Sequence, residues 1–234
     1  MDVPVTIAAN LQRVRERIAQ AAERSGRSAE SVTLVGVTKY LPTAATRVLA
    51  DQGCLDLGES RPQSLWEKSA DLADLPIRWH MIGHLQRNKV KRTLPLLSLL
   101  HSGDSLRLLE EVNGEAASLN RRLPVLIEVN ISGDAAKHGF SPEEVEPALS
   151  QVAELTRLQV RGLMTMASLE GGADQARHDF AALRELRDRL RTVCPPSIRL
   201  DELSMGMSGD YEAAILEGAT LIRVGSALCE GLDP

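Results

Sequence analysis

Short apolar stretches return at regular intervals along the chain and alternate with segments of helical periodicity. Eight such stretches cover residues 32–39, 55–58, 77–83, 96–101, 125–130, 160–167, 199–205 and 221–227. Most are rich in β-branched side chains and are bounded by turn-forming residues. This pattern predicts short strands that are buried on both faces.

Amphipathic helices are predicted between these strands, over residues 43–52, 60–73, 85–93, 104–121, 142–156, 174–192 and 209–217. Asp104 and Ser141 are the expected N-caps of two of them. A further helix precedes the first strand and stops near Gly26. Its apolar stripe consists of Ile7, Leu11, Val14, Ile18 and Ala21.

Strands that alternate with helices form a parallel sheet covered by helices, and eight is the number that closes a (β/α)8 TIM barrel. The sequence therefore predicts an α/β fold with a single TIM-barrel domain over residues 1–234. The helix within residues 1–27 is expected to pack on this barrel. A doubly wound open sheet is the alternative, weakened because no Gly-x-Gly-x-x-Gly motif follows the first strand.

Composition narrows the class of protein. The 234 residues are 43% hydrophobic, and the net charge of −5 gives no electrostatic case for nucleic acid or an anionic membrane. Aromatic residues are too scarce for a platform that stacks bases. Three widely spaced cysteines fit no metal-ligand pattern, and the first residues lack the features of a signal peptide. We therefore expect a cytoplasmic protein with reduced thiols, and a monomer because no long apolar surface stripe is present.

Lys39 closes the first apolar stretch, and chemistry in a TIM barrel lies at the carboxyl ends of the strands. An ammonium group is costly to bury unless it is paired or neutral. Lys39 is therefore either a surface residue whose stem lies along the strand or a reactive amine that forms a Schiff base with a carbonyl compound.

Two loops rich in glycine and serine follow the seventh and eighth strands, where phosphate sites commonly lie in this fold. The glycines are Gly206, Gly209 and Gly225, and the serines are Ser204, Ser208 and Ser226. Glycines let backbone amides approach a ligand closely, and a helix that begins near Asp210 favours an anion. Tight turns built from the same residue types are the alternative.

Other residues near the strand ends are less specific. His84 could act as a base, or serve as a cap or a packed ring. His80 is expected to be structural. Most of Met164, Met166, Met205 and Met207 are expected to fill the barrel. The basic run over residues 87–92 is expected to be a solvated helix face.

An amine and a phosphate cradle at one barrel mouth favour a phosphorylated carbonyl ligand. Two classes of protein fit, a class I aldolase acting on a sugar phosphate and a binder of pyridoxal phosphate. Arg223 favours the second class, because it projects to the same face as Gly225 and could face the ring nitrogen of a pyridine. A permanent positive charge there disfavours protonation of the ring, which suits carriage more than broad carbanion chemistry.

Seven segments carry a family resemblance: residues 34–39 (LVGVTK), 58–60 (GES), 79–89 (WHMIGHLQRNK), 129–132 (VNIS), 162–166 (GLMTM), 203–208 (LSMGMS) and 223–227 (RVGSA). With these motifs the chain resembles, over almost its whole length, the YggS/PROSC family of pyridoxal phosphate homeostasis proteins. The resemblance implies a barrel of the alanine racemase N-terminal type (fold type III). It also implies that pyridoxal 5'-phosphate is held as a Schiff base on Lys39.

The resemblance implies phosphate contacts from Ser204, Gly225 and Ser226, with Arg223 near the pyridine nitrogen. The full set of expected cofactor-binding residues is Lys39, His84, Asn130, Met164, Ser204, Met205, Gly206, Arg223, Gly225 and Ser226. Members of the family are regarded as carriers or regulators of the cofactor pool without an established turnover. The implied function is therefore intracellular cofactor homeostasis, with apo forms of pyridoxal phosphate enzymes as candidate recipients.

Three positions qualify the resemblance. Ser60 stands where the family usually has asparagine, which puts a direct ring contact there in doubt. Ser226 replaces a common threonine and keeps the hydroxyl group. Lys137 matches a family lysine suspected of secondary cofactor binding, with a solvated loop lysine as the alternative.

Two enzyme classes remain as alternatives. An amino-acid racemase of the alanine racemase type uses a second β domain and a base on the opposite face of the ring. The second domain is not expected, because the chain ends at Pro234. A dedicated base is not expected either, because Tyr40 should point away from Lys39 and Tyr211 should lie on the helix after the cradle. A class I aldolase would need a second lysine or a carboxylate inside the barrel, and only Lys39 is clearly placed for that role.

Overall fold

Eight parallel strands form a closed barrel in the computed structural model, which describes residues 2–168 and 172–232. Each strand pairs with its neighbours in the sequence, and β8 pairs with β1 to close the ring. The strands are β1 (Thr33–Val37), β2 (Asp56–Glu59), β3 (Arg78–Met81), β4 (Leu97–Gly103), β5 (Leu123–Glu128), β6 (Leu158–Met164), β7 (Glu202–Ser204) and β8 (Leu221–Val224). The predicted TIM barrel is confirmed, and the doubly wound sheet is excluded.

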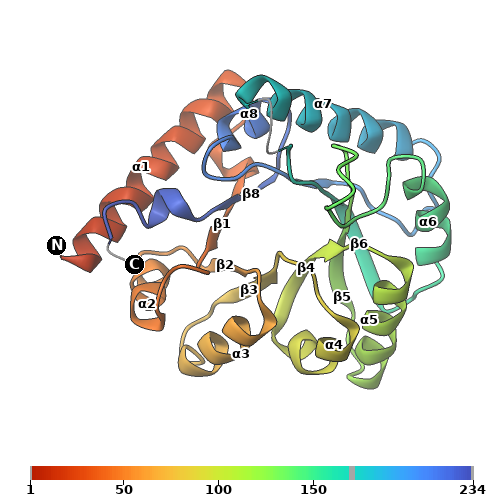
Figure 1. The fold of residues 1–234 in the computed structure, drawn as a ribbon, viewed down its shortest axis with the longest axis horizontal. Coiled ribbons are helices and arrows are strands. Elements are labelled where there is room, and N and C mark those ends of the chain that lie inside the picture. Colours follow the sequence, from red (N-terminus) through yellow and green to blue (C-terminus); the bar gives the residue numbers. More distant parts are fainter. Residues whose placement is uncertain (1, 169–171, 233–234) are drawn as a thin grey trace.

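Helices surround this barrel, as Figure 1 shows. They are α1 (Val3–Arg24), α2 (Thr43–Asp51), α3 (Pro62–Asp71), α4 (Arg87–Thr93), α5 (Leu106–Ser118), α6 (Val145–Val152), α7 (Gly172–Leu190) and α8 (Tyr211–Leu216). Short 3-10 helices lie at η1 (Ala29–Ser31), η2 (Leu94–Leu96) and η3 (Ser226–Leu228). None of the helices in the described part of the chain is long and apolar enough to cross a membrane.

Most elements are shorter than their sequence patterns predict. β1 ends at Val37 and β6 at Met164, two and three residues before the predicted ends, because pairing stops where the chain turns toward the next helix. The N-cap of α5 is Ser105, whose hydroxyl accepts from the amide of Leu108, and not Asp104. Candidate residues at the strand ends therefore lie in turns, where strand alternation no longer determines their direction.

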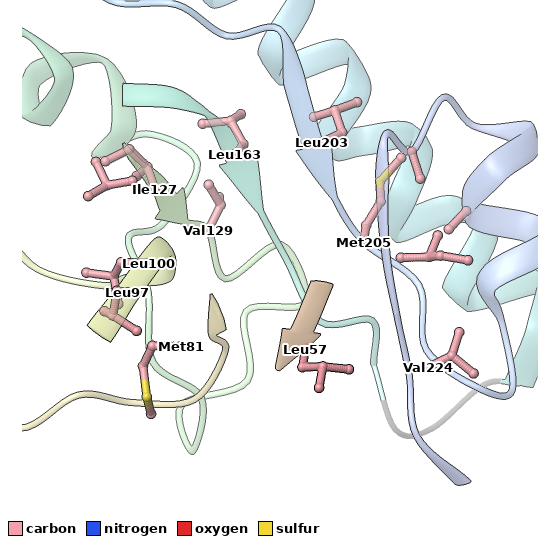
Figure 2. Close-up of a cluster of buried hydrophobic side chains, with 14 of the residues drawn as sticks. Leu57, Met81, Leu97, Leu100, Ile127, Val129, Leu163, Leu203, Met205 and Val224 are labelled. Atoms are coloured by element: carbon pink, nitrogen blue, oxygen red, sulfur yellow. The ribbon is translucent and has the colours of Figure 1, made fainter. Parts of the chain in front are cut away.

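Two apolar layers hold the barrel together. The outer layer lies between strands and helices, and Figure 2 shows part of it, with labelled side chains such as Leu57, Leu163 and Met205. The inner layer fills the barrel with Val35, Leu99, Leu126, Met164 and Leu221. Burial of these aliphatic side chains away from water is the main stabilising contribution to the barrel.

Helix α1 packs across the seam where β8 meets β1. Its buried stripe contacts α8, α2 and η3, beside the carboxyl-terminal segment in Figure 1. The buried side-chain amide of Asn10 donates to the carbonyls of Leu228 and Glu230 at 3.2 and 2.8 Å. Arg27 donates to the carbonyls of Ile215 and Ala219, at the end of α8. The first and last segments of the described chain are thus joined by hydrogen bonds as well as by packing.

Candidate functional site

A cavity of about 410 Å³ opens among the loops at the carboxyl ends of the strands. This volume falls in the range of small-molecule sites. Its lining residues are Val37, Lys39, Tyr40, Ser60, Ile82, Gly83, His84, Glu128, His138, Met166, Met207, Ser208, Gly209, Arg223, Gly225 and Ser226. Five of the ten predicted cofactor-binding residues are brought together there: Lys39, His84, Arg223, Gly225 and Ser226.

Lys39 lies in the turn after β1, and its side chain is exposed. The sequence places Lys39 at the end of a buried strand, but its side chain is not buried in the structure. Its amine is therefore accessible to a ligand. The amine stands 4.7 Å from the ring centroid of Tyr40, which also lines the cavity. The expectation that Tyr40 points away from Lys39 is wrong, because the strand has already ended at Val37.

Arg223 presents a buried guanidinium group to the cavity, and only 3% of the residue is exposed. One of its nitrogens donates to Ser204 Oγ at 2.5 Å, and another donates to the carbonyl of Thr165 at 2.9 Å. Burial lowers the pKa of Arg223 to about 10, while Glu128 and Asp210 act against that fall. The group therefore remains a cation at neutral pH, held in one orientation by two hydrogen bonds.

Two backbone amides converge on the cavity wall after β8. The amides of Gly225 and Ala227 donate to Ser208 Oγ at 3.1 and 3.3 Å. A Cβ atom on Gly225 would lie 3.2 Å from Val37 Cβ, so glycine allows the chain to pack closely against β1 here. Ser226 beside them is exposed. These donors form a set that can hold the oxygens of an anion.

Glu128, at the end of β5, was not singled out from the sequence. It lines the cavity, yet only 5% of it is exposed. Burial raises its pKa to about 7, with a smaller contribution from Asp104, while Arg223 and His84 act in the opposite direction. The sequence signal was the acidic residue at the end of an otherwise apolar strand. The cavity therefore contains a carboxylate, whereas the sequence placed only Lys39 clearly inside the barrel.

His84 lies at the rim, where its Nδ1 is 2.6 Å from Asp104 Oδ2 and its ring stacks on His138 at a centroid distance of 4.1 Å. The ligating atoms of these three residues lie within 4.8 Å of one another, so they are the set in the described chain that could hold a metal ion. The hydrogen bond and the stacking account for the arrangement without one. His84 is thus a ring fixed at the rim, as one of the two sequence interpretations had it.

The other five predicted residues lie outside the cavity lining. Met164 belongs to the inner core and Met205 to the outer core. Of the four methionines expected mostly to fill the barrel, Met164 does so, Met166 packs against the inner core from the cavity side, and Met207 lines the cavity. Gly206 has φ of +92°, and a Cβ there would lie 2.6 Å from Ala214, so this glycine is needed for packing on α8. Ser204 is fully buried and bonded to Arg223.

Asn130 and Lys137 organise the loop after β5. The amide of Asn130 donates to the carbonyl of Asp134 at 2.8 Å. The amine of Lys137 donates to Ser132 Oγ and to the carbonyls of Met166 and Ala167. Lys137 is therefore a half-buried clamp between two loops, in contrast with the solvated loop lysine, and it lies outside the cavity lining. Its secondary contact with the cofactor stays a prediction.

Comparison with known proteins agrees with this geometry. Residues 8–232 match the family model described as alanine racemase, N-terminal domain. The chain is 40% identical to the pyridoxal phosphate homeostasis protein of Aquifex aeolicus (strain VF5), covering 93% of this chain and 95% of the relative. Identity is also 40% to the protein of that name from Pseudomonas aeruginosa PAO1, over 97% and 96% of the two chains. The chain belongs to the pyridoxal phosphate homeostasis protein family.

The chain is also similar to a solved structure, PipY of Synechococcus elongatus PCC7942 with PLP bound. It is 35% identical, with a TM-score of 0.84 over 95% of this chain and 99% of PipY. The resemblance read from the motifs is thereby confirmed, as is the alanine racemase type of barrel.

Proposed function

We propose that this protein binds pyridoxal 5'-phosphate in the cavity at the carboxyl ends of the strands and serves cofactor homeostasis. The observation that carries the proposal is the lining of one cavity. An accessible amine, a fixed guanidinium and a pair of converging amides come from the ends of β1 and β8, which are neighbours in the closed barrel. The names of the relatives and the PLP in PipY support the same ligand.

The donor set fits the phosphate group. Gly225 and Ala227 already direct their amides at one oxygen, that of Ser208, as they would at a phosphate oxygen. The exposed hydroxyl of Ser226 can add a third contact. The predicted contact with Ser204 stays a prediction, and it would require that hydroxyl to leave its present partners.

Arg223 fits the ring nitrogen. A cation there disfavours a second positive charge on the pyridine, so the nitrogen stays an acceptor. When bound, the cofactor supplies an aldehyde for amines and a conjugated ring that stabilises negative charge. A ring kept neutral stabilises such charge poorly, which favours holding the cofactor over broad catalysis.

Lys39 is proposed to hold the cofactor as a Schiff base. Its amine and the aldehyde carbon form a carbon–nitrogen double bond, one water leaves, and no oxidant is required. Because Lys39 is exposed, an incoming amine can reach the same carbon and release the cofactor. Accessibility of this kind suits a carrier that loads apo enzymes.

Attachment to Lys39 is tested by adding pyridoxal phosphate, recording the visible spectrum, and reducing the protein with borohydride. We expect an absorption band and a mass label on the peptide containing Lys39, and both should be lost in Lys39→Ala. Lys91→Ala, which removes an exposed lysine on α4, is the matched control and should keep both. An unchanged band in Lys39→Ala would refute the attachment, and the absence of binding by the parent protein would refute the function itself.

An amino-acid racemase remains the second candidate, and Glu128 favours it. A carboxyl group with a pKa of about 7 inside the cavity can take up and release a proton near neutral pH. Loss of optical activity from L-alanine at a rate typical of metabolic enzymes would overturn the carrier proposal. Transfer of cofactor from the loaded protein to an apo enzyme, faster than from free cofactor at equal concentration, would support it.

The carrier is further proposed to be a cytoplasmic monomer. The large apolar side chains exposed on the described part of the chain are few: Val3 and Val5 on α1, Tyr40 beside Val3, and Leu119 and Val193 in other segments. So small a number of exposed apolar side chains is normal on a monomer surface. Light scattering coupled to gel filtration gives the mass in solution, and a dimer mass would contradict the monomer.

A further inference from the structure

A chain of buried polar side chains runs through the barrel from the amino ends of the strands to the cavity. It begins at Asp56, the first residue of β2, and passes through His80 on β3, His101 on β4 and Ser204 on β7 to Arg223. The successive separations are 3.1 Å (Asp56 Oδ1 to His80 Nε2), 2.8 Å (His80 Nδ1 to His101 Nε2), 2.8 Å (His101 Nδ1 to Ser204 Oγ) and 2.5 Å (Ser204 Oγ to Arg223). His101 and Ser204 are fully buried, so no water replaces these contacts.

The two ends of the chain determine the direction of every hydrogen bond in it. Arg223 can only donate, so Ser204 accepts from it and has its own proton free for His101 Nδ1. His101 then carries its proton on Nε2 and donates it to His80 Nδ1. His80 in turn donates from Nε2 to Asp56, which accepts when ionised. Every donor meets an acceptor with both rings neutral and both in the Nε2–H tautomer.

The charges of the ends support this direction. Burial opposes the ionisation of Asp56, but hydrogen bonds from His80 and Arg78 outweigh it and lower the pKa of Asp56 to about 2. Burial also lowers the pKa of His101 well below its ordinary value, and the charges on His80 and Arg223 act in the same direction. His101 is therefore a neutral ring between an anion at one end and a cation at the other.

Reversal of the chain requires one additional proton. If His80 donates from Nδ1 to His101, its Nε2 faces the carboxylate of Asp56 and must also carry a proton. His101 then holds its proton on Nδ1 and donates it to Ser204, which accepts from two donors and turns its own hydroxyl proton elsewhere. The two arrangements differ by one proton and by the tautomer of His101.

We propose that Asp56, His80, His101 and Ser204 form a relay that positions Arg223 and transmits the protonation state of His80 to it by switching the tautomer of His101. This inference rests on the proposed function only in making Arg223 a contact of the cofactor. The relay itself exists without a ligand. His101 and Ser204 are positioning residues in this scheme, because they act through Arg223.

Other charged groups around the relay place the additional proton on His80. Arg78 on β3 binds Asp56 with two nitrogens and holds it as an anion. Burial raises the pKa of Glu202 on β7, and Arg161 on β6 and His80 act against that rise, so a second acidic group faces His80.

At the cavity end, Glu128 on β5 and Asp210 before α8 face Arg223. They lie beyond Ser204 and make no hydrogen bond to either ring. The acidic groups of the relay thus surround His80, whereas His101 has Arg223 on its far side.

The relay is tested by long-range proton–nitrogen NMR on histidine-labelled protein without cofactor. While both rings are neutral, we expect both in the Nε2–H tautomer. In any state in which the spectra show protons on both nitrogens of His80, the proton of His101 should lie on Nδ1.

Two variants give independent tests of the relay. Asp56→Asn removes the anion that faces His80 Nε2, so the doubly protonated form of His80 and the switch of His101 should be lost. Asp201→Asn, a matched loss of charge on the exposed residue before β7, should leave the switch intact. Ser204→Ala removes the donor to His101 Nδ1, so His101 should no longer be fixed in one tautomer. This variant tests the relay by itself if Asp56→Asn does not fold. Nδ1–H on His101 in the parent protein while both rings are neutral, or a His101 that ignores the protonation of His80, would overturn the relay.

The cofactor-loaded protein provides the second readout. Its visible band should shift with the midpoint of the His101 switch, and the shift should disappear in Ser204→Ala. Failure to load cofactor would refute the proposed function and leave the NMR result standing. A normal band with no His101 switch would refute the relay and leave the proposed function standing.

Discussion

Glu128 is a buried carboxyl group that lines the cavity, and its protonation is linked to the stability of the fold. Burial raises its pKa from 4.5 to about 7, so the folded protein binds a proton that the unfolded chain has already released. Below pH 4.5 Glu128 is protonated in both the folded and the unfolded state, so its burial does not reduce stability through ionisation. As the pH rises from 4.5 to about 7, the unfolded chain is favoured increasingly because only there does the carboxyl group ionise freely. Above about 7 this loss of stability is constant.

We therefore expect Glu128→Gln to stabilise the protein without cofactor at alkaline pH, because the amide cannot ionise. The rise from 4.5 to about 7 corresponds to about 3 kcal/mol above pH 7, with little difference at acidic pH. Urea unfolding followed at several pH values measures it. Glu154→Gln, at an exposed carboxylate, should show no such trend. A Glu128→Gln gain that does not change with pH would contradict the assigned ionisation.

At the scale of elements, α3 is fastened to the barrel by a buried ion pair. Lys68 on α3 donates to Glu59 Oε1 on β2 and to the carbonyl of Thr38, both at 2.6 Å. The hydroxyl of Thr38 donates to the same oxygen of Glu59. Since Thr38 precedes Lys39, this contact also fixes the start of the turn that carries the amine. The other oxygen of Glu59 is buried and has no hydrogen-bond partner among the described residues, so the pair is incompletely satisfied.

Lys68→Met should destabilise the protein by about 3 to 5 kcal/mol, because it leaves the carboxylate of Glu59 buried and uncompensated. Glu59→Leu combined with Lys68→Met should recover most of that loss, since two apolar side chains carry no desolvation penalty. Lys91→Met on the exposed face of α4 is the matched control, expected to stay within about 0.5 kcal/mol. Denaturant unfolding measures the free energy of unfolding of all three variants. A double variant less stable than Lys68→Met would show that the pair is not the main contact.

At the scale of the whole molecule, α1 closes the seam between β8 and β1. Ile7, Leu11 and Val14 are buried, and Asn10 donates to the end of η3 and to the residue two positions beyond it. A helix with this much buried contact should unfold with the barrel and not before it. The prediction of a single domain over residues 1–234 can therefore be tested by measuring whether α1 and the barrel unfold in one transition.

Leu11→Ala should lower the free energy of unfolding by about 2 to 5 kcal/mol, through a cavity in the seam. Val5→Ala, on the exposed side of the same helix, should have little effect. Far-ultraviolet circular dichroism reports the helices, and fluorescence reports Trp66 on α3 and Trp79 on β3. Coincident shifts of both transitions are expected in Leu11→Ala. An earlier helical transition with unchanged fluorescence would mean that α1 folds as a separate unit.

The pattern of apolar and polar positions by itself determined the barrel. Eight buried strands alternating with helices have one common closed arrangement, and hydrophobic periodicity is a local property that sequence displays directly. Position in the strand count also located Lys39, Arg223, Gly225 and Ser226 at one mouth. The motifs around them were sufficient to identify the family.

Only the tertiary structure decided what each polar side chain does. Tyr40 turns into the cavity because β1 ends early, and Lys137 forms a clamp because the loop after β6 presents two carbonyls to it. Glu128, His80 and His101 gain their properties from burial and from partners far away in the chain. Such long-range contacts leave no local pattern in a sequence, so the chemistry inside the barrel required the closed fold.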